Sequence, residues 1–279
     1  MALWRIQTAG GERVARGPVE AGPVELLEGT LDSLLAAGSL DAPAAGPVPA
    51  GSVVLAPVAG QEVWAAGVTY AVSRTARNEE SGGHDFYNLV YDAERPELFF
   101  KAAPGRTRGP GAAVGVREDS GWDVPEPELA LVISAGGEIL GYTIGNDVSS
   151  RSIEGENPLY LPQAKLFAGA CAIGPAILTA NGTAPDFEIS MRILGADGSE
   201  LFAGETSTAR MQRSFEELVN WLRRDNPVPL GSVLLTGTGL VPPDDFTLEP
   251  GQRVEIHVPE IGTLVNPVGR AADLMTKER

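Results

Sequence analysis

Residues 126–147 read EPELALVISAGGEILGYTIGND, and this stretch decides the fold. Two apolar runs, 126–133 and 138–147, lie on either side of Ser134-Ala135-Gly136-Gly137. The first run has the length and composition of a strand, and two adjacent glycines favour a tight turn between antiparallel strands. The sequence therefore predicts a β-hairpin.

Three carboxylates are predicted to meet on this hairpin. The two-residue period of a strand puts Glu126 and Glu128 on one face. In the register set by a turn centred on the glycines, Asp147 lies opposite Glu126, and Gly145 opposite Glu128, with opposite Cβ atoms ~5 Å apart. From spacing alone, the alternative is an edge of solvent-facing acids that never touch, because a slip of one residue breaks the register.

Three carboxylates this close repel one another, and a divalent cation is the simplest compensation. Ligation by oxygen alone, with open positions, favours Mg²⁺ or Mn²⁺ over Zn²⁺, and Ca²⁺ also fits such a site. The sequence thus predicts a metal site at Glu126, Glu128 and Asp147.

The composition restricts the possible partners. The 279 residues are 43% hydrophobic, enough for a large core, and their net charge of −16 disfavours nucleic acid and anionic membrane as partners. The same charge repels an acidic substrate, so a bound cation or a local Lys/Arg cluster has to reverse the field inside the site.

The cysteine content and the hydropathy pattern favour the cytoplasm. Cys171 is the only cysteine, so no intramolecular disulfide can form. The first residues, MALWRI, lack the apolar run of a signal peptide, and no stretch approaches the roughly 20 apolar residues of a membrane span. We expect a cytoplasmic protein with no membrane partner.

The 34 Gly and 22 Pro are spread along the chain as turn signals, which favours many short strands. We expect a β-rich α+β protein with a small N-terminal domain over residues 1–60 and a catalytic domain over 61–279. Further predicted strands read GPAILTA, FEISMRIL, SVLLTGTG, RVEIHV and GTLVNPV.

Two helices are predicted from their caps and their apolar spacing. Residues 31–37 form the first, with Thr30 as a candidate N-cap. Residues 214–224 form the second, with Ser214-x-x-Glu217 as a capping box and apolar residues at helical spacing.

The charged and aromatic segment 70–97 is expected to be a mobile lid, with Ser81-Gly82-Gly83 in its middle. His84 lies there, and we interpret it as a solvated loop residue, the alternative being that it swings into the site. His257 alternates within a predicted strand and has no obvious acidic partner. Neither histidine is expected to be catalytic.

Four blocks resemble the signatures of the fumarylacetoacetate hydrolase superfamily, over most of residues 64–268: PEPELALVI, GYTIGNDVSSRSIEGENPLYLPQAK, LLTGTGLVP and LEPGQRVEIHVPEIGTLVNPV. The resemblance implies a mixed β-sandwich roll or barrel with a small N-terminal α/β domain. In that superfamily the E-x-E and N-D carboxylates hold the metal, which agrees with the hairpin prediction. It also suggests a homodimer or homotetramer.

The same resemblance implies the other site residues. Lys165 matches the superfamily's active-site lysine, and Lys101 the lysine of its F-x-K strand. Lys101 either contacts substrate or forms a buried structural pair. The expected substrate-binding residues are Lys101, Thr69, Arg151 and the Thr-Gly-Thr loop of Thr236, Gly237 and Thr238.

Within the superfamily, VTYAVSRTARNEES, ERPELFFKA, WDVPEPELALV and SRSIEGENPLYLPQAK are most similar to 2-keto-3-deoxy-D-arabinonate dehydratases. This implies Mg²⁺-dependent conversion of 2-dehydro-3-deoxy-D-arabinonate, a small anionic 2-oxo acid of pentose catabolism, to 2,5-dioxopentanoate. Abstraction of a C3 proton and loss of the C4 hydroxyl require one base and one acid.

Two departures from the superfamily pattern bear on the reaction. Its hydrolases carry a His in the first lid segment, and residues 70–74 have none. After Arg151, Ser152 and Glu154 stand where Asp and Gln are common. Glu154 is therefore either the acid or base of a dehydratase or a surface charge, and Lys165 and Glu154 are the candidate catalytic pair with their roles unassigned.

Other functions use the same metal site. Hydrolysis of the C–C bond in an acylpyruvate or a fumarylacetoacetate-like diketone is the main alternative, and the missing lid His weighs against it. Oxaloacetate decarboxylation and 2-oxo acid isomerisation would use the same enolate. A non-catalytic metal-binding module is a further alternative, against which the retained acids and Lys165 count.

Overall fold

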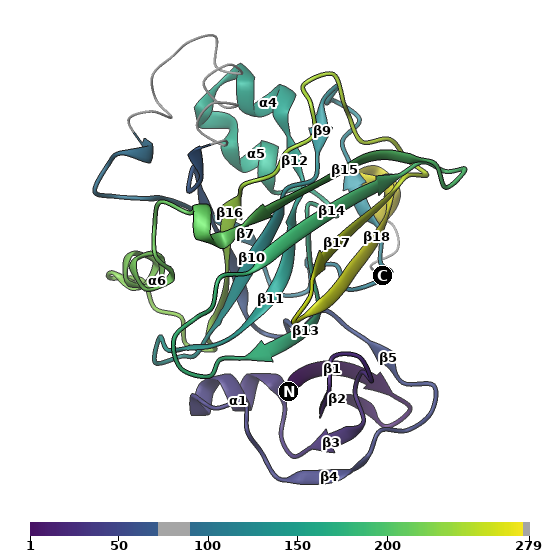
Figure 1. Cartoon of the computed structure of the whole chain (residues 1–279), viewed down its shortest axis with the longest axis vertical. Coiled ribbons are helices and arrows are strands. Elements are labelled where there is room, and N and C mark those ends of the chain that lie inside the picture. Colours follow the sequence, from purple (N-terminus) through teal and green to yellow (C-terminus); the bar gives the residue numbers. More distant parts are fainter. Residues whose placement is uncertain (72–89, 276–279) are drawn as a thin grey trace.

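The computed structural model describes residues 1–71 and 90–275. Most of the expected lid, including Ser81-Gly82-Gly83 and His84, lies outside the described residues. The chain forms two large mixed β-sheets with short helices at their ends, which confirms the β-rich α+β class (Figure 1).

The larger sheet has 11 strands in the order β4-β3-β2-β1-β13-β11-β10-β16-β6-β7, with β5 paired to β1. The strands near the site are β10 (Pro127–Ile133), β11 (Ile139–Asp147), β13 (Cys171–Thr179), β16 (Ser232–Thr238), β6 (Glu62–Gly67) and β7 (Glu97–Ala102). Every residue of β10 and β16 is buried, as expected of strands covered on both faces.

The predicted hairpin and its register are confirmed. Glu128 pairs with Gly145 in the β10–β11 ladder, and the Asp147 amide donates to the Glu126 carbonyl over 3.0 Å. The ladder shifts only near the turn, between Val132 and Ile133, so the register around the acids is preserved. The alternative in which the acids never meet is wrong.

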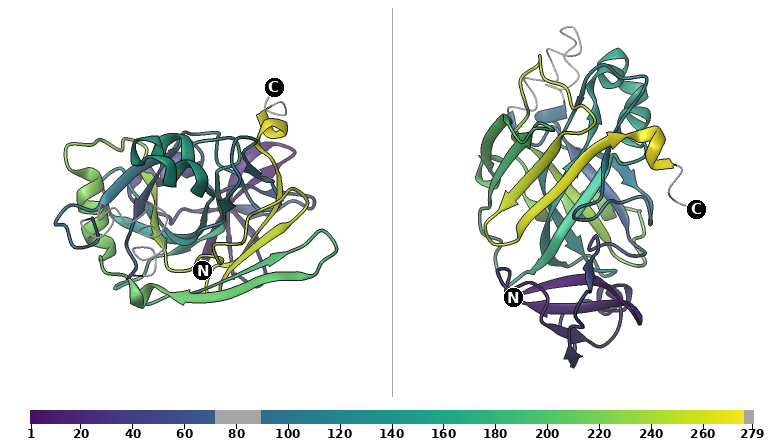
Figure 2. Two further views of the ribbon diagram at one scale, coloured as in Figure 1. Left: turned by 90° about the horizontal axis from the view of Figure 1, so that it is seen from above. Right: turned by 90° about the vertical axis from the view of Figure 1, so that its right-hand side faces the viewer.

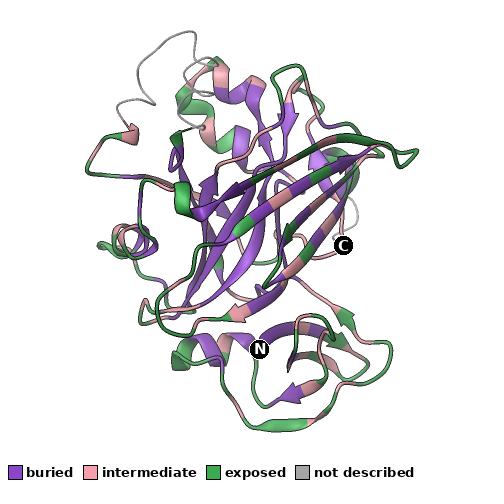
Figure 3. Ribbon diagram, in the orientation of Figure 1, coloured by how far each residue is buried: buried purple, intermediate pink, exposed green. Residues whose placement is uncertain are grey.

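The second sheet has the order β15-β14-β17-β18-β8 and packs across the first. Its strands are β15 (Glu200–Ser207), β14 (Glu188–Leu194), β17 (Arg253–Val258), β18 (Gly262–Arg270) and β8 (Val114–Val116). In β17 the buried residues alternate with exposed or half-buried ones, and Ile256 is among the residues facing the core. Side chains of both sheets form one core. The buried stretches of these strands are purple in Figure 3.

Helix α6 (Phe215–Arg223) covers part of this core. Ser214 is its N-cap and accepts from the Glu217 amide over 3.1 Å, so the predicted N-cap is confirmed. The Glu217 carboxylate accepts from Arg213 rather than from the Ser214 amide, so the other half of the predicted capping box is not formed. Leu218, Val219 and Leu222 are buried, and burying each stabilises the fold by about 1.5–3 kcal/mol.

The N-terminal elements lie at one end of the molecule (Figures 1 and 2). They are β1 (Ala2–Thr8), β2 (Gly11–Gly17), β3 (Glu25–Leu27), α1 (Leu31–Ala37), β4 (Ala44–Pro47) and β5 (Val53–Val54). Helix α1 has the predicted limits and the predicted N-cap, Thr30. Strand β1 pairs with β13, so these strands continue the large sheet, and the boundary at residue 60 stays a prediction.

Short elements gather at the opposite end of the molecule (Figure 1). Strands β9 (Asp123–Val124) and β12 (Ser149–Ser150) pair, and the chain then forms α4 (Arg151–Glu156), η1 (Pro158–Tyr160) and α5 (Leu161–Lys165). Two further short helices in the described part of the chain are η2 (Thr208–Arg210) and α7 (Ala271–Met275). No helix in the described part of the chain is long and apolar enough to cross a membrane.

Candidate active site

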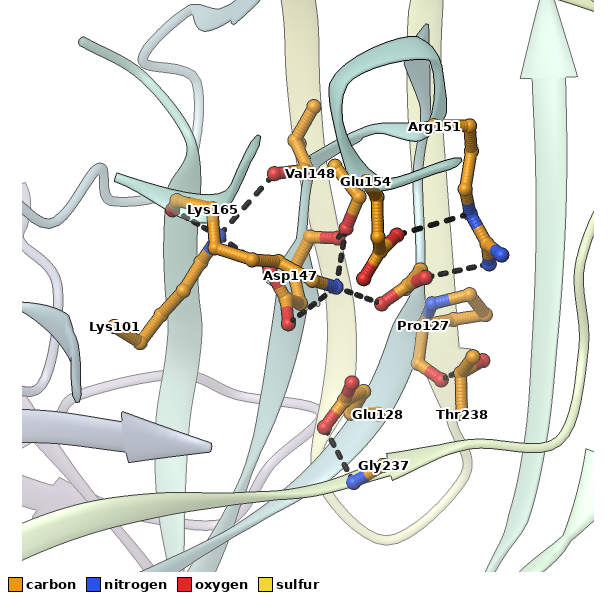
Figure 4. A network of polar contacts seen from close by, with 12 residues as sticks. Lys101, Pro127, Glu128, Asp147, Val148, Arg151, Glu154, Lys165, Gly237 and Thr238 are labelled. Carbon is orange, nitrogen blue, oxygen red and sulfur yellow. Dashed lines mark hydrogen bonds and ion pairs between the residues drawn. The ribbon is translucent and has the colours of Figure 1, made fainter. Parts of the chain in front are cut away.

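The three predicted metal ligands meet where β10 and β11 are paired. One carboxylate oxygen from each of Glu126, Glu128 and Asp147 lies within 4.8 Å of the others, and all three residues are buried. The hairpin register brings them together, because Asp147 on β11 is next to Glu126, which immediately precedes β10. Figure 4 shows Glu128 and Asp147 within a network of polar contacts.

Lys165 supplies a cation at the centre of this network. It ends α5 and is fully buried, and its Nζ lies 2.7 Å from Glu126 Oε2 and 3.1 Å from Asp147 Oδ2. The same Nζ donates to Ser149 Oγ over 2.5 Å, and Ser149 in turn donates to the Asp147 carbonyl. The structure therefore brings the predicted catalytic lysine into contact with two of the three carboxylates.

Lys101 approaches Asp147 from another side. Its Nζ forms an ion pair with Asp147 Oδ1 and donates to the carbonyls of Val148 and Lys165, over 3.2 Å and 2.7 Å. This is the geometry of the buried structural pair that the sequence left open. A contact between Lys101 and substrate stays a prediction.

Arg151 and Glu154 extend the network from α4. Arg151 donates to Glu126 Oε1 over 2.6 Å, and its Nε lies 3.8 Å from Glu154 Oε2. Only 1% of Glu154 is exposed, because α4 turns the residue inward rather than continuing the loop that Gly155-Glu156-Asn157-Pro158 suggested. The interpretation of Glu154 as a surface charge is wrong.

The Thr-Gly-Thr segment, expected as a loop, is instead the C-terminal end of β16, where Thr238 pairs with Glu128 of β10. The Gly237 amide donates to Glu128 Oε2 over 2.6 Å. Gly237 has a left-handed φ of +94°, and a Cβ there would collide with Thr69 Oγ1, so both the backbone conformation and the space favour glycine. Thr236 and Thr238 donate to the carbonyls of Leu129 and Pro127, and Thr69 donates to the Thr236 carbonyl. These hydroxyls hold the end of β16 on β10, and their contacts with substrate stay predictions.

The charges of this buried cluster nearly cancel. Among the described residues it contains three cations, Lys101, Arg151 and Lys165, and four carboxylates, Glu126, Glu128, Asp147 and Glu154. Burial raises the pKa of Glu128 well above its usual range, and the charges of Asp147 and Glu126 raise it further. The cluster thus keeps an excess of negative charge, and a bound divalent cation would make it net positive, which is the local reversal of field that an acidic substrate requires.

The three carboxylates fit a hard divalent cation. Their donor atoms are all oxygen, and the cavity that they line with Gly67, Val68 and Phe99 has a volume of about 10 Å³, roughly the space of one water molecule. Val68 has a left-handed φ of 53°, which is strained for a β-branched residue. This strained residue directly follows β6, at the wall of the ion-sized cavity.

Sequence reasoning assigned no role to three buried polar residues near the site. Ser149 lies in the N-D-x-S-x-R block, so its place two residues after Asp147 was an available signal. Tyr70 is 2% exposed, and burial together with the charge of Glu128 raises the pKa of its hydroxyl. Asp123 is 2% exposed on β9 and pairs with Ser150. No local pattern marks Tyr70 or Asp123, because long-range packing buries them.

Asp123 should make stability depend on pH. Burial raises its pKa from 3.8 to about 6, so the folded state holds this proton more tightly than the unfolded state. The resulting stabilisation is fully present below about pH 4 and is lost as pH rises through about 6. Asp123→Asn removes this dependence. As the pH rises from about 4 to 7, the free energy of unfolding of the variant minus that of wild type should therefore increase by about 1–2 kcal/mol, allowing for screening.

Urea unfolding of the metal-free protein at a series of pH values measures this difference. Asp119→Asn is the matched control, because Asp119 is exposed and hydrogen bonds to Arg117 lower the pKa of its carboxyl. A difference between Asp123→Asn and wild type that stays constant over this pH range would contradict the prediction.

The fold and the site together define a class of protein: a β-rich enzyme with a buried carboxylate triad for a divalent cation and a lysine in contact with it. Residues 63–269 match the family model for the C-terminal part of fumarylacetoacetate (FAA) hydrolase. The chain belongs to the fumarylacetoacetate hydrolase family.

Two relatives that are similar over three quarters of this chain both carry the names of sugar-acid dehydratases. The chain is 54% identical over 213 residues to a probable 2-keto-3-deoxyxylonate dehydratase of Haloferax volcanii, covering 76% of this chain and 73% of the relative. It is 47% identical over 218 residues to 2-dehydro-3-deoxy-D-arabinonate dehydratase of Saccharolobus solfataricus, with the same coverage.

A solved structure extends the likeness to nearly the whole chain. That structure is of 2-keto-3-deoxy-D-arabinonate dehydratase complexed with magnesium and 2,5-dioxopentanoate. It superposes with a TM-score of 0.85 at 38% identity and covers 97% of this chain and 99% of its own. The family, the β-rich fold and the dehydratase relationship predicted from the sequence are confirmed.

Proposed function

We propose that this protein is a Mg²⁺-dependent hydro-lyase that converts 2-dehydro-3-deoxy-D-arabinonate to 2,5-dioxopentanoate in pentose catabolism. The observation that carries the proposal is the buried triad of Glu126, Glu128 and Asp147, with Lys165 Nζ in contact with two of its members. Support for the substrate comes from the two dehydratase relatives and from the product named in the similar solved structure.

The two relatives' names point to one substrate class. Xylonate and arabinonate of the same D series differ in configuration only at C2 and C3. A 2-oxo, 3-deoxy acid has no stereocentre at either carbon, so both parent acids lead to the same five-carbon compound. The two names therefore describe the same proposed substrate.

The proposed roles follow from the contacts. Glu126, Glu128 and Asp147 would hold Mg²⁺, with Gly237 fixing the Glu128 carboxylate. A bound Mg²⁺ supplies Lewis acidity that polarises a 2-oxo group and acidifies the neighbouring C3 protons. Lys101 orients Asp147, and the cations of the cluster offset the charge of an anionic substrate.

The reaction requires several proton movements that the buried groups can serve. A base removes a proton from C3, and the C4–O bond breaks as the hydroxyl takes a proton and leaves as water. A proton then moves from C5 to C3, which gives the enol of the aldehyde, and protonation at C4 with loss of the enol O–H proton yields the product. Lys165 and Glu154 are the candidate acid and base, since both are buried within the polar network.

The position of Glu154 favours dehydration over hydrolysis of a C–C bond. Its carboxylate lies beside Arg151, which contacts the metal-ligand candidate Glu126, so an additional acid or base stands at the site. Residues 70–74 still lack the histidine of the hydrolases. The two observations agree on the reaction class.

The direct test is turnover by metal-stripped protein with and without added Mg²⁺. The substrate is 2-dehydro-3-deoxy-D-arabinonate, and an aldehyde dehydrogenase coupled to the assay reports the C5 aldehyde. We expect product only with Mg²⁺. Protein that binds Mg²⁺ but forms no product would overturn the dehydratase proposal, and an acylpyruvate assayed in parallel would then test the hydrolase alternative.

We also infer that the protein is a homodimer or homotetramer located in the cytoplasm. The superfamily resemblance supports the oligomeric state, and the cysteine content supports the location. Light scattering on the purified protein measures the assembly, and a monomer at working concentration would contradict it. Fractionation of the source cells tests the location.

A further inference from the structure

The segment that follows β6 places Tyr70 two residues beyond Val68, which lines the cavity of the carboxylate triad. Strand β6 ends at Gly67, and Gly67 and Val68 line the ion-sized cavity. Thr69 is then held by its hydrogen bond to the Thr236 carbonyl, and Tyr70 forms a β-bridge with Met211. The backbone of Tyr70 is thus fixed from both sides, within three residues of the cavity wall.

The ring of Tyr70 packs against Gly239, the residue that follows the Thr-Gly-Thr end of β16. A Cβ at Gly239 would lie 2.5 Å from Tyr70 Cδ1 and 2.7 Å from Cε1, so only a glycine leaves space for the ring. The same end of β16 carries the Gly237 amide that binds Glu128, and the charge of Glu128 acts on the Tyr70 hydroxyl. Residues 237–239 therefore contact both Tyr70 and the metal-ligand candidate Glu128.

The Tyr70 hydroxyl lacks a hydrogen-bond partner among the described residues, although the residue is 2% exposed. A buried hydroxyl without a partner costs free energy, and most buried hydroxyls in folded proteins are paired. A phenylalanine would fill the same space without this cost. The hydroxyl is thus a buried donor without a partner in the described part of the chain, and the charge of the metal-ligand candidate Glu128 acts on it.

We propose that the Tyr70 hydroxyl contacts the substrate and donates a hydrogen bond to its C4 hydroxyl, the group that leaves as water. This inference rests on the proposed function. The ion held by the triad and the cations of the cluster would bind the 2-oxo and carboxylate end of a substrate. A neutral donor such as the Tyr70 hydroxyl then suits the uncharged hydroxyl two carbons further along.

The test compares Tyr70→Phe with wild type in two reactions, both with saturating Mg²⁺. The first is dehydration of 2-dehydro-3-deoxy-D-arabinonate. The second is exchange of the C3 protons of 2-oxopentanoate in D₂O, followed by NMR, which needs proton abstraction but no leaving hydroxyl. We expect kcat/KM for dehydration to fall at least tenfold and the exchange rate to stay within twofold. Tyr142→Phe, a buried tyrosine on β11 packed against Phe187 and Phe215, is the matched control.

Each other outcome overturns the inference. Unchanged dehydration would mean that the hydroxyl contacts no group that matters. Equal losses in both reactions, or a matching loss in Tyr142→Phe, would mean that the substitution disturbs the site as a whole. Wild-type protein that exchanges C3 protons but releases no 2,5-dioxopentanoate would contradict the dehydratase function itself, and this result appears before any variant is compared.

Discussion

Glu126→Gln is expected to lower kcat/KM for dehydration on the order of a thousandfold, since metal polarisation contributes several kcal/mol to a barrier. The amide keeps the shape of the side chain but removes the charge of one proposed metal ligand. It also leaves Lys165 and Arg151, which lie 2.7 Å and 2.6 Å from the carboxylate oxygens, without their shared anion. Activity measured over a series of Mg²⁺ concentrations should show a metal requirement raised at least tenfold.

Glu188→Gln provides the matched control for this variant. Glu188 is exposed on β14, so the same chemical change there should leave both kcat/KM and the Mg²⁺ requirement as in wild type. A Glu126→Gln enzyme that retains wild-type activity at the same Mg²⁺ concentration would exclude Glu126 as a metal ligand. A loss of activity with an unchanged Mg²⁺ requirement would indicate that Glu126 only positions Lys165 and Arg151.

Lys165→Met is expected to lower turnover at least 10³-fold and also to destabilise the protein. Proton transfer by a positioned side chain contributes about 10²–10⁴-fold, and here the lost group also contacts two proposed metal ligands. Removing one partner of a buried ion pair leaves an uncompensated charge and costs about 3–5 kcal/mol. Added Mg²⁺ should recover part of the lost Tm, because the ion would replace the missing positive charge.

Lys165→Arg separates the two effects. It keeps a positive charge beside Glu126 and Asp147, so it should retain more thermal stability than Lys165→Met. A guanidinium does not give up its proton in proteins, so turnover should stay as low as in the methionine variant. Thermal unfolding with and without Mg²⁺, together with the dehydration assay, measures both quantities. Recovery of full turnover by arginine would show that Lys165 acts only as a fixed charge.

The metal site was predictable because it depends on local geometry. One turn fixes the register of β10 and β11, and the two-residue period of a strand then places the three acids. The helices α1 and α6 were predictable for the same kind of reason, since Thr30 and Ser214 cap them within a few residues.

The cations and Glu154 depend on packing between segments far apart in the sequence. Lys101 contacts Asp147 because the fold brings β7 close to residues 147–148 and 165. No spacing rule in the sequence relates these positions. For these lysines only the family resemblance pointed to the site. The surface-charge interpretation of Glu154 was wrong because a loop-like composition after α4 gives no information on which side of the helix faces inward.

The pairing of β1 with β13 has a consequence for shortening the chain. Strand β13 lies between β1 and β11, and its Cys171 is the ladder partner of Asp147. Deletion of the N-terminal strands would remove the partners of Ile177 and Leu178 on β13 and open a sheet edge there, on the strand that also pairs with β11 and its metal-ligand candidate Asp147. Such an edge is a template for pairing with other chains. The N-terminal strands thus protect the catalytic sheet from self-association, whether or not they take any part in catalysis.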